Sequence, residues 1–389
     1  LPTPSPHQGA LSNTTQHNTT QHNTTQHSWH FELWDFICFF PLFMMNTTTQ
    51  RRLATLSRHL TTSHDPSYKT SWASILPHSA PGRSLKFTDK EWRLRCKLAC
   101  AYRVANSLGW DQVIFNHITA RVPNSEHESD GPHFLINPLG LRFDEVTACS
   151  LLKVTTEGKI KDNGTNAGGL FRQGFVIHSA IHAVRHDAVC VWHCHHENTA
   201  AVCMTKTGLL PLSQEAIGVL PQVAYHPFEG TANDMSEIPR LQQNIGHHKK
   251  ILLLDNHGPL TLGTTIDEAF ALMFNVCRAS SYQQKAMAAV GGNLNRLYLP
   301  DETKLAAMYE RGRNNTRMKE AEKGGGGGGD GDYEEGAGAN PSDELMFRAL
   351  CRVVEDKYGA EKIYDIERAY VDVESRVSSS VLEKETTTT

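Results

Sequence analysis

The sequence predicts an α/β domain in which helices flank a central, mostly antiparallel β-sheet. Several short, β-branched segments are bounded by turn residues, as strands are, and some follow one another with only a tight turn between them. Longer amphipathic segments carry helix-start signals. Strand and helix do not alternate regularly along the chain, so hairpins are favoured over the repeated units of a doubly wound parallel sheet.

Helices are predicted where apolar residues recur every three or four positions. In residues 87–110, Thr88 and Glu91 form a capping box, and Thr265 and Glu268 form another at the start of 264–289. The remaining predicted helices are 174–187 and 342–359.

Strands are predicted in the segments between these helices. The segment 151–160 has the centre of a hairpin at Glu157-Gly158, and 249–263 reads as two strands around a sharp turn. The other predicted strands are 112–122, 133–138, "AVCVWHCH" (188–195) and "VAYHPF" (223–228).

Composition is that of one medium domain with tails. The 389 residues are 39% hydrophobic and 21% charged with a net charge of −4, so a nucleic-acid partner is not expected. Nine cysteines without a CxxC pair indicate free thiols in a reducing compartment. The folded domain is predicted at 87–300, followed by a Gly-rich acidic linker (301–341), a C-terminal helix (342–364) and a mostly disordered tail (365–389).

The N-terminal part is not expected to belong to that domain. Residues 1–43 contain a threefold "NTTQH" repeat and are expected to be a disordered leader or translated upstream sequence; their apolar stretch 29–43 is too short to span a membrane. Residues 44–86 begin with a stretch, Met44 to His64, that lacks acidic residues, which fits a transit peptide and a start at Met44 or Met45. A disordered Ser/Thr-rich leader fits equally, so the expected location is cytoplasmic, mitochondrial or plastid.

Two histidines at the end of a predicted strand indicate a metal site. Side chains on a strand alternate between faces, so His193 and His195 share one face while Cys194 points into the core. His257 also follows an apolar strand and precedes Gly258, which permits a tight turn. Zinc accepts neutral imidazole ligands, and manganese, iron or cobalt would suit the same three histidines. Because the chain has 21 histidines, surface or structural roles remain the alternative.

The longer motifs resemble the class II aldolase/adducin family. The resemblance runs from about Lys90 to Gly292 and is carried by "GFVIHSAIHAVRHDAVCVWHCHHENTAAVCMTKTGLLPLSQEA", "VAYHPFEG" and "DNHGPLTLGTTIDEAF". It implies a three-layer α/β/α domain, a homo-oligomer that is usually a tetramer, and a divalent metal, typically zinc, on the positions of His193, His195 and His257. In the enzymes of the family, the metal stabilises the enediolate formed when a carbon–carbon bond breaks.

The catalytic positions of the family are altered. The glutamate that serves as acid and base in the aldolases corresponds to Gly174, which cannot move a proton. His178, one turn later, could shuttle a proton or could be a packed structural histidine. Glu215 falls roughly where a catalytic tyrosine lies, although helix capping or solvation is the alternative.

The resemblance also implies a substrate-binding set. Asn116, Thr119, Asn137 and Gly140 match segments that hold a sugar phosphate, but the small hydroxyl residues that complete phosphate binding are replaced by Arg172-Gln173-Gly174. A phosphorylated sugar is therefore not the expected substrate.

Three functions follow from these observations. The first is a metal-dependent aldolase or epimerase acting on a small hydroxy-carbonyl compound. The second is a non-catalytic, adducin-like scaffold with actin or spectrin as partners, although the C-terminus lacks a lysine-rich segment. The third is a metal-binding domain that senses a ligand.

Overall fold

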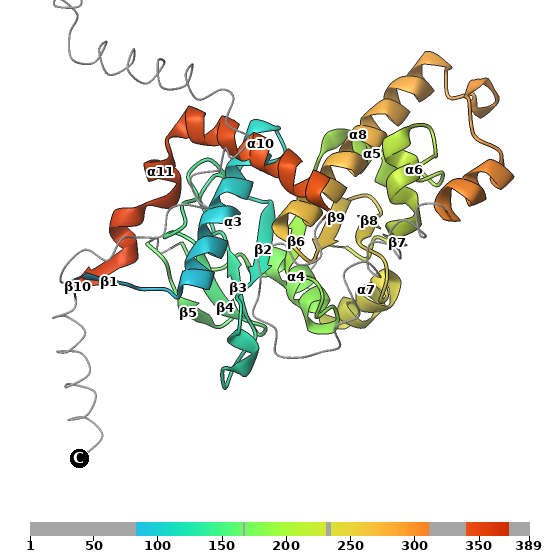
Figure 1. Ribbon diagram of the computed structural model, residues 1–389. Coiled ribbons are helices and arrows are strands. Elements are labelled where there is room, and N and C mark those ends of the chain that lie inside the picture. Colours follow the sequence, from blue (N-terminus) through green and yellow to red (C-terminus); the bar gives the residue numbers. More distant parts are fainter. Residues whose placement is uncertain (1–82, 166–167, 231–234, 311–339, 373–389) are drawn as a thin grey trace, which may run out of the picture. The chain divides into compact units, whose positions relative to one another are not determined.

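The structure is a computed structural model that describes residues 83–165, 168–230, 235–310 and 340–372. Figure 1 shows the described elements along the chain. The expected leader at 1–43, nearly all of the possible transit segment 44–86, most of the linker and the end of the tail lie outside these residues.

An eight-stranded sheet forms the centre of the domain. Its strand order is β5-β4-β3-β2-β6-β9-β8-β7, and every neighbouring pair is antiparallel except β7 and β8. The predicted fold, a mostly antiparallel sheet with helices, is confirmed. The strands are β2 (His117–Arg121), β3 (His133–Ile136), β4 (Leu152–Thr155), β5 (Ile160–Asp162), β6 (Cys190–His193), β7 (Val223–His226), β8 (Ile251–Leu254) and β9 (Gly258–Gly263).

Helices cover both faces of this sheet, as Figure 1 shows. On one face lie α3 (Asp89–Ser107), α5 (Glu197–Cys203), α6 (Gln214–Val219), α8 (Ile266–Ala289) and α10 (Pro341–Tyr358). On the other lie α4 (Arg172–Val184) and α7 (Ile238–Ile245). Thr88 and Thr265 cap α3 and α8 by accepting hydrogen bonds from the backbone N–H groups of Glu91 and Glu268, so both predicted N-termini are confirmed.

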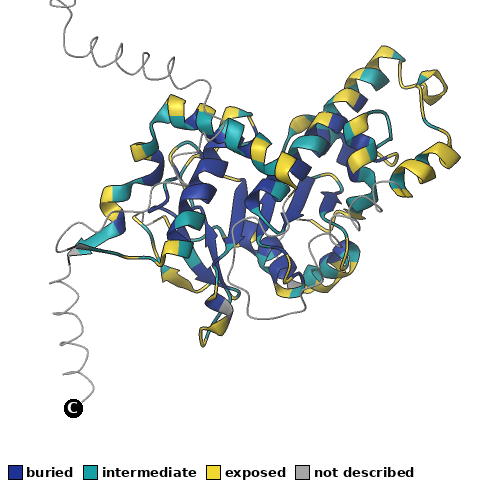
Figure 2. Ribbon diagram, viewed as in Figure 1, coloured by how far each residue is buried: buried dark blue, intermediate teal, exposed yellow. Residues whose placement is uncertain are grey.

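The alternation of side chains along the strands divides the core between these two faces. On β6, Cys190 and Trp192 belong to the cluster beneath α3 and α8, whereas Val191 packs with residues of α4 and α7. The sheet is accordingly buried on both sides, while the outer faces of the helices are exposed (Figure 2). His193, two residues after Val191, therefore lies on the α4 face.

The ends of the described chain differ from the expected pattern. The expected single helix at 342–364 is divided into α10 and α11 (Ala360–Tyr364) at Gly359, whose φ of +85° is incompatible with a continuous helix. β1 (Arg83–Leu85) and β10 (Tyr370–Asp372) pair antiparallel, so short parts of two segments expected to be disordered are ordered. Residues 302–310, within the expected linker, are helical.

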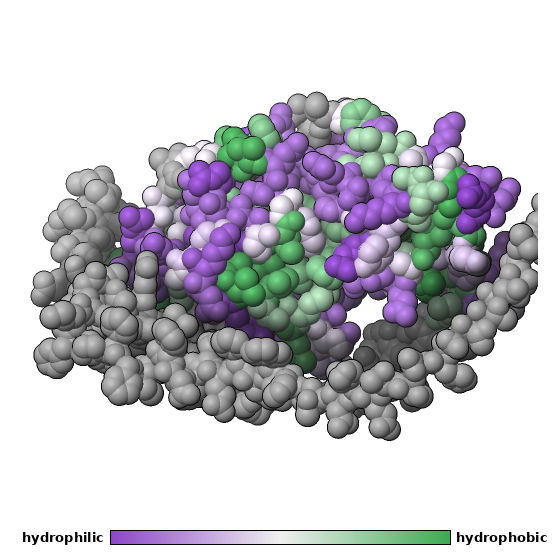
Figure 3. Space-filling view, turned by 90° about the horizontal axis from the view of Figure 1, so that it is seen from above, coloured by the Kyte–Doolittle hydropathy of each residue, from purple (hydrophilic) through white to green (hydrophobic). Residues whose placement is uncertain are grey.

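The surface, the helices and the cysteines of the described residues have the following properties. The face shown in Figure 3 is mainly hydrophilic, with apolar residues in separate patches. None of the described helices has the length and apolarity needed to cross a membrane. The eight described cysteines are buried and free.

Candidate metal centre

Three histidines converge at one end of the central strands, and together they could hold a metal ion. His193 is the last residue of β6, His195 follows it, and His257 lies in the turn between β8 and β9. Their ligand atoms all lie within 4.8 Å of one another. Nε2 of His195 is 2.9 Å from Nε2 of His193 and 2.8 Å from Nε2 of His257. The structure thus brings together the three histidines predicted as ligands.

Hydrogen bonds from the opposite ring nitrogens orient two of these imidazoles. Nδ1 of His193 lies 2.9 Å from the backbone oxygen of Pro259, and Nδ1 of His195 contacts the side-chain oxygen of Gln112. Both partners are acceptors, so Nδ1 carries the hydrogen and Nε2 keeps its lone pair. Metal-binding histidines are commonly oriented in this way. Sequence reasoning missed Gln112, which comes from a loop distant in sequence.

The turn that carries His257 is built differently from the prediction. Asn256, with φ of +54°, is its left-handed residue, a conformation that asparagine tolerates better than most residues. Gly258 is required for another reason. A Cβ on Gly258 would lie 2.9 Å from the backbone oxygen of Cys194, so glycine lets β9 approach the chain beside His195.

The environment keeps these histidines neutral. Burial is the main cause that lowers the pKa of His195 to about 4, with the neighbouring His257 adding to the shift. Burial also lowers the pKa of His257, and it lowers that of His193 well below the usual range. Neutral imidazole is the form that binds metal ions.

Cys194 points away from the three histidines, as predicted from strand alternation. It is fully buried, and its sulfur lies 3.5 Å from the sulfur of Met273 in α8. His196, two residues later, caps α5 by accepting a hydrogen bond from the backbone N–H of Thr199. Neither side chain is positioned to join the metal site.

His117 occupies the space beside Gly174. It pairs with His193 across β2 and β6, and its ring centre is 5.5 Å from that of His193. A Cβ on Gly174 would lie only 2.3–2.7 Å from three atoms of the His117 ring. The glycine is therefore matched to His117, because any side chain at position 174 would displace the imidazole.

The predicted acid–base candidates have different surroundings. His178 is fully buried on α4, and its ring centre lies 4.5 Å from that of His117. Glu215 is half-buried in the first turn of α6. No hydrogen bond or ion pair joins Glu215 to the three histidines within the described structure. His178 is thus the candidate that the fold brings close to the three clustered histidines.

Most of the predicted substrate-binding residues are engaged in internal contacts. The hydroxyl of Thr119 is buried between His178 and His182. The amide of Asn116 donates to the backbone oxygen of Trp110, and the amide oxygen of Asn137 lies 2.9 Å from the hydroxyl of Tyr102. Gly140 has φ of +94°, and a Cβ built on it would have nothing within 4 Å. Thr119 has no free hydrogen for a ligand, which argues against its predicted contact with substrate.

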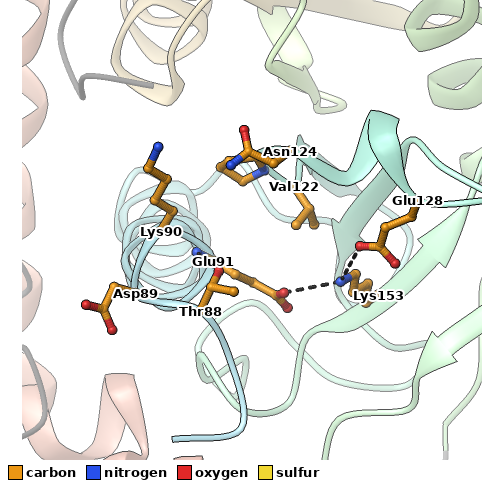
Figure 4. Close-up of a pocket in the computed structure, with 9 residues that line it drawn as sticks. Thr88, Asp89, Lys90, Glu91, Val122, Asn124, Glu128 and Lys153 are labelled. Carbon is orange, nitrogen blue, oxygen red and sulfur yellow. Dashed lines mark hydrogen bonds and ion pairs between the residues drawn. The ribbon is translucent and has the colours of Figure 1, made fainter. Parts of the chain in front are cut away.

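A second group of potential ligands lies near β3. Glu128, Asp130 and His133 also have ligand atoms within 4.8 Å of one another. A pocket of about 440 Å³ nearby is lined by Glu91, Glu128 and Lys153, among others. Figure 4 shows Lys153 bridging Glu91 and Glu128. The pocket does not include any of the three clustered histidines.

Comparison with known proteins gives consistent matches. The family model for the class II aldolase and adducin N-terminal domain matches residues 96–283. An aldolase II superfamily protein from Pseudomonas syringae is similar at 36% identity and a TM-score of 0.60, covering 71% of this chain and 97% of that one. L-fuculose 1-phosphate aldolase from Glaciozyma antarctica is similar at 25% identity and a TM-score of 0.54, covering 71% and 93%.

Alpha-adducin from Rattus norvegicus is 45% identical over 216 residues. That alignment covers 56% of this chain but only 29% of the adducin. The similarity therefore covers only a minor part of the length of alpha-adducin.

Proposed function

Because the chain belongs to the class II aldolase and adducin family, we propose that its three histidines bind a divalent metal and that the site acts on a small hydroxy-carbonyl compound. The observation that carries the proposal is the approach of the Nε2 atoms of His193 and His195 to 2.9 Å. Each of these nitrogens carries a lone pair, because each Nδ1 donates its hydrogen elsewhere. Two lone pairs at this distance repel unless they share a proton or a metal ion.

The chemistry of the site favours the metal over the proton. The lowered pKa of His195, about 4, disfavours a shared proton at neutral pH. Nitrogen ligands suit zinc, and other first-row divalent ions share this preference. When bound, such an ion would polarise a carbonyl oxygen as a Lewis acid. His193, His195 and His257 would hold it.

The remaining requirement is a group that accepts a proton from the substrate. Position 174 carries no carboxylate, in contrast to the aldolases that the sequence resembles. His178 is the best-placed alternative, because its ring centre lies 4.5 Å from that of His117, which pairs with His193 across β2 and β6. Burial lowers the pKa of His178, so its imidazole is neutral. A neutral imidazole can accept a proton from a hydroxyl or a carbon acid. The proposed reaction class is enolisation, the step common to aldol cleavage and related isomerisations.

The proposal is tested by measuring the metal content of the protein and then its ability to catalyse enolisation. We expect about one metal ion per chain by elemental mass spectrometry, and deuterium exchange at the carbon next to the carbonyl of dihydroxyacetone in heavy water. A chelator should abolish the exchange, and metal should restore it. Metal-free protein, or exchange that is indifferent to the chelator, would contradict the proposal. His186→Phe, at an exposed position of α4's C-terminal flank, serves as the control for histidine replacement.

A second function is favoured by the similarity to alpha-adducin. In that case the domain would act as a binding module without catalysis, with partners of the kind that adducin-like scaffolds bind. The absence of a carboxylate at position 174 is consistent with this alternative. Stoichiometric metal without any exchange, together with co-sedimentation with actin filaments, would favour the scaffold over the enzyme.

A further inference from the structure

Two buried imidazole nitrogens near the clustered histidines have no hydrogen-bond partner in the part of the chain that the structure describes. Nε2 of His117 and Nε2 of His178 are buried, and neither makes a hydrogen bond among the described residues. The two rings lie side by side, with centres 4.5 Å apart, and the His117 ring is 5.5 Å from that of His193. Unpartnered polar atoms of this kind are rare in folded proteins, and each requires an explanation.

A chain of hydrogen bonds determines which hydrogens His178 carries. Nδ1 of His182 lies 3.1 Å from the backbone oxygen of Ala188 and must donate to it, so Nε2 of His182 is an acceptor. The hydroxyl of Thr119, 2.8 Å away, donates its only hydrogen to that Nε2. The same hydroxyl must then accept from Nδ1 of His178 at 2.7 Å. Nε2 of His178 is consequently left as a bare acceptor.

His117 reaches the same state through a different contact. The backbone carbonyl of Phe115 lies 3.3 Å from Nδ1 of His117 and meets hydrogen-bond geometry. Nδ1 therefore carries the hydrogen, and Nε2 is again a bare acceptor. Two buried lone pairs thus have no donor among the described residues.

From this arrangement we infer that His117 and His178 bind a hydroxyl group of an uncharged ligand whose carbonyl lies at the metal centre. The inference rests on the proposed function and adds the substrate class to it. Lone pairs attract a hydroxyl hydrogen and repel a phosphate oxygen, so the pair selects a non-phosphorylated polyhydroxy-carbonyl compound. Gly174 contributes by leaving room for the His117 ring.

Dihydroxyacetone and hydroxyacetone provide a matched pair of probes. Both offer a carbonyl and one adjacent hydroxyl, and only dihydroxyacetone has a second hydroxyl. Using zinc-loaded full-length protein, we expect dihydroxyacetone to bind about five- to tenfold more tightly, the effect of one net hydrogen bond. Dihydroxyacetone phosphate should bind more weakly than dihydroxyacetone. Equal affinity for the two ketones, tighter binding of the phosphate, or no binding of either ketone would overturn the inference.

Substitutions test whether the two histidines cause the preference for dihydroxyacetone over hydroxyacetone. His117→Phe and His178→Phe should each reduce the ratio of the two affinities to about one, while His186→Phe should leave this ratio unchanged. His117→Gln, which retains a polar side chain, serves if the aromatic variant does not fold. A preference that survives in both His117→Phe and His178→Phe would contradict the assignment.

Nitrogen NMR of the ¹⁵N-histidine protein tests the hydrogen positions without a ligand. We expect a protonated Nδ1 and an unprotonated Nε2 in both His117 and His178, with the signals assigned from the variants. Addition of dihydroxyacetone should shift both Nε2 signals, and hydroxyacetone should not. Protonated Nε2 atoms in the free protein would overturn the inference even if metal binding and enolisation are established. Absence of metal with the expected hydrogen positions would instead contradict the proposed function.

Discussion

Two clusters in this domain each have ligand atoms within 4.8 Å of one another, yet their surroundings differ. In the cluster of His193, His195 and His257, the atoms that approach one another are nitrogens of neutral imidazoles. The opposite ring nitrogens of His193 and His195 are hydrogen-bonded to Pro259 and Gln112, respectively. In the second cluster, Lys161 lies 2.9 Å from Asp130, and Lys153 lies 3.5 Å from Glu128. The buried His133 completes that cluster. Its Nε2 lies 3.3 Å from Asp130, and its Nδ1 lies 3.4 Å from Glu128.

The difference shows that proximity of ligands does not define a metal site. The carboxylates of the second cluster already have lysine ammonium groups as counter-ions, so a metal ion would have to displace them. Within the described structure, the three histidines have no such cation beside them. Metal should therefore bind to the histidine cluster and not to the acidic one.

The largest expected effect is loss of metal from the histidine cluster. His193→Ala or His257→Ala should reduce metal content from about one per chain to near zero, because two nitrogens do not complete the site. His133→Ala should leave the content unchanged. Elemental mass spectrometry on folded protein measures all three.

Cys194→Ala provides a second control for this prediction. Its sulfur faces Met273 in the core, so metal content should be retained. Loss of metal in His133→Ala or Cys194→Ala, or its retention in both histidine variants, would contradict the distinction between the clusters.

His117, which packs beside the histidine cluster, and Asp130 of the acidic cluster should respond differently to pH. The folded-state pKa of His117 is about 4 and lies below an unfolded value of about 6.5, so stability is full above pH 6.5 and decreases as the pH falls toward 4. For His117 this difference corresponds to about 3 kcal/mol. The pKa of Asp130 is lowered by its hydrogen bond to Lys161, so its contribution is lost only below about pH 4.

Urea unfolding of metal-free protein between pH 8 and pH 4.5 measures this effect. As the pH is lowered, the free energy of unfolding should decrease in the wild type and decrease less in His117→Phe. The other histidines whose pKa values burial lowers, which include His178, His182 and the three clustered histidines, contribute the slope that remains. Equal slopes in the two proteins would show that His117 is not held neutral.

A smaller effect is expected for the residue that orients His195. Gln112→Ala removes the acceptor for Nδ1 of His195 and leaves all three ligands in place. Loss of such a partner typically lowers metal affinity about 10- to 100-fold. Competition with a chromogenic chelator would measure this change. An unchanged affinity would mean that Gln112 does not fix the ring.

The cluster of three histidines could be predicted from the sequence because each histidine's position depends on local periodicity. His193 and His195 end one apolar strand and His257 follows another, so strand alternation and strand ends sufficed. Gln112 could not be found in this way, because its contact with His195 depends on how a loop 83 positions away folds back. The tight turn was expected at Gly258, but its left-handed residue is Asn256, and the close approach of Cys194 explains the glycine.

His117 was missed although a signal was present. The resemblance directed attention to Asn116 and Thr119 in "FNHITAR". Strand alternation places His117 and Thr119 on one face and Asn116 outside it, which would have indicated His117 instead. The match between His117 and Gly174 joins a strand to a helix and could be seen only in the fold.

The smallest expected effect concerns the acidic cluster. Asp130→Asn removes a charge that is paired with Lys161 at the surface, where solvent screens the ion pair, so its contribution to stability should be small. A double-mutant cycle with Lys161→Met, followed by urea unfolding, should give a small coupling energy and no change in metal content. A change in metal content on Asp130→Asn would show that the acidic cluster binds the ion despite its lysines. Proximity would then suffice after all, and the resident ammonium groups would not be what distinguishes the two clusters.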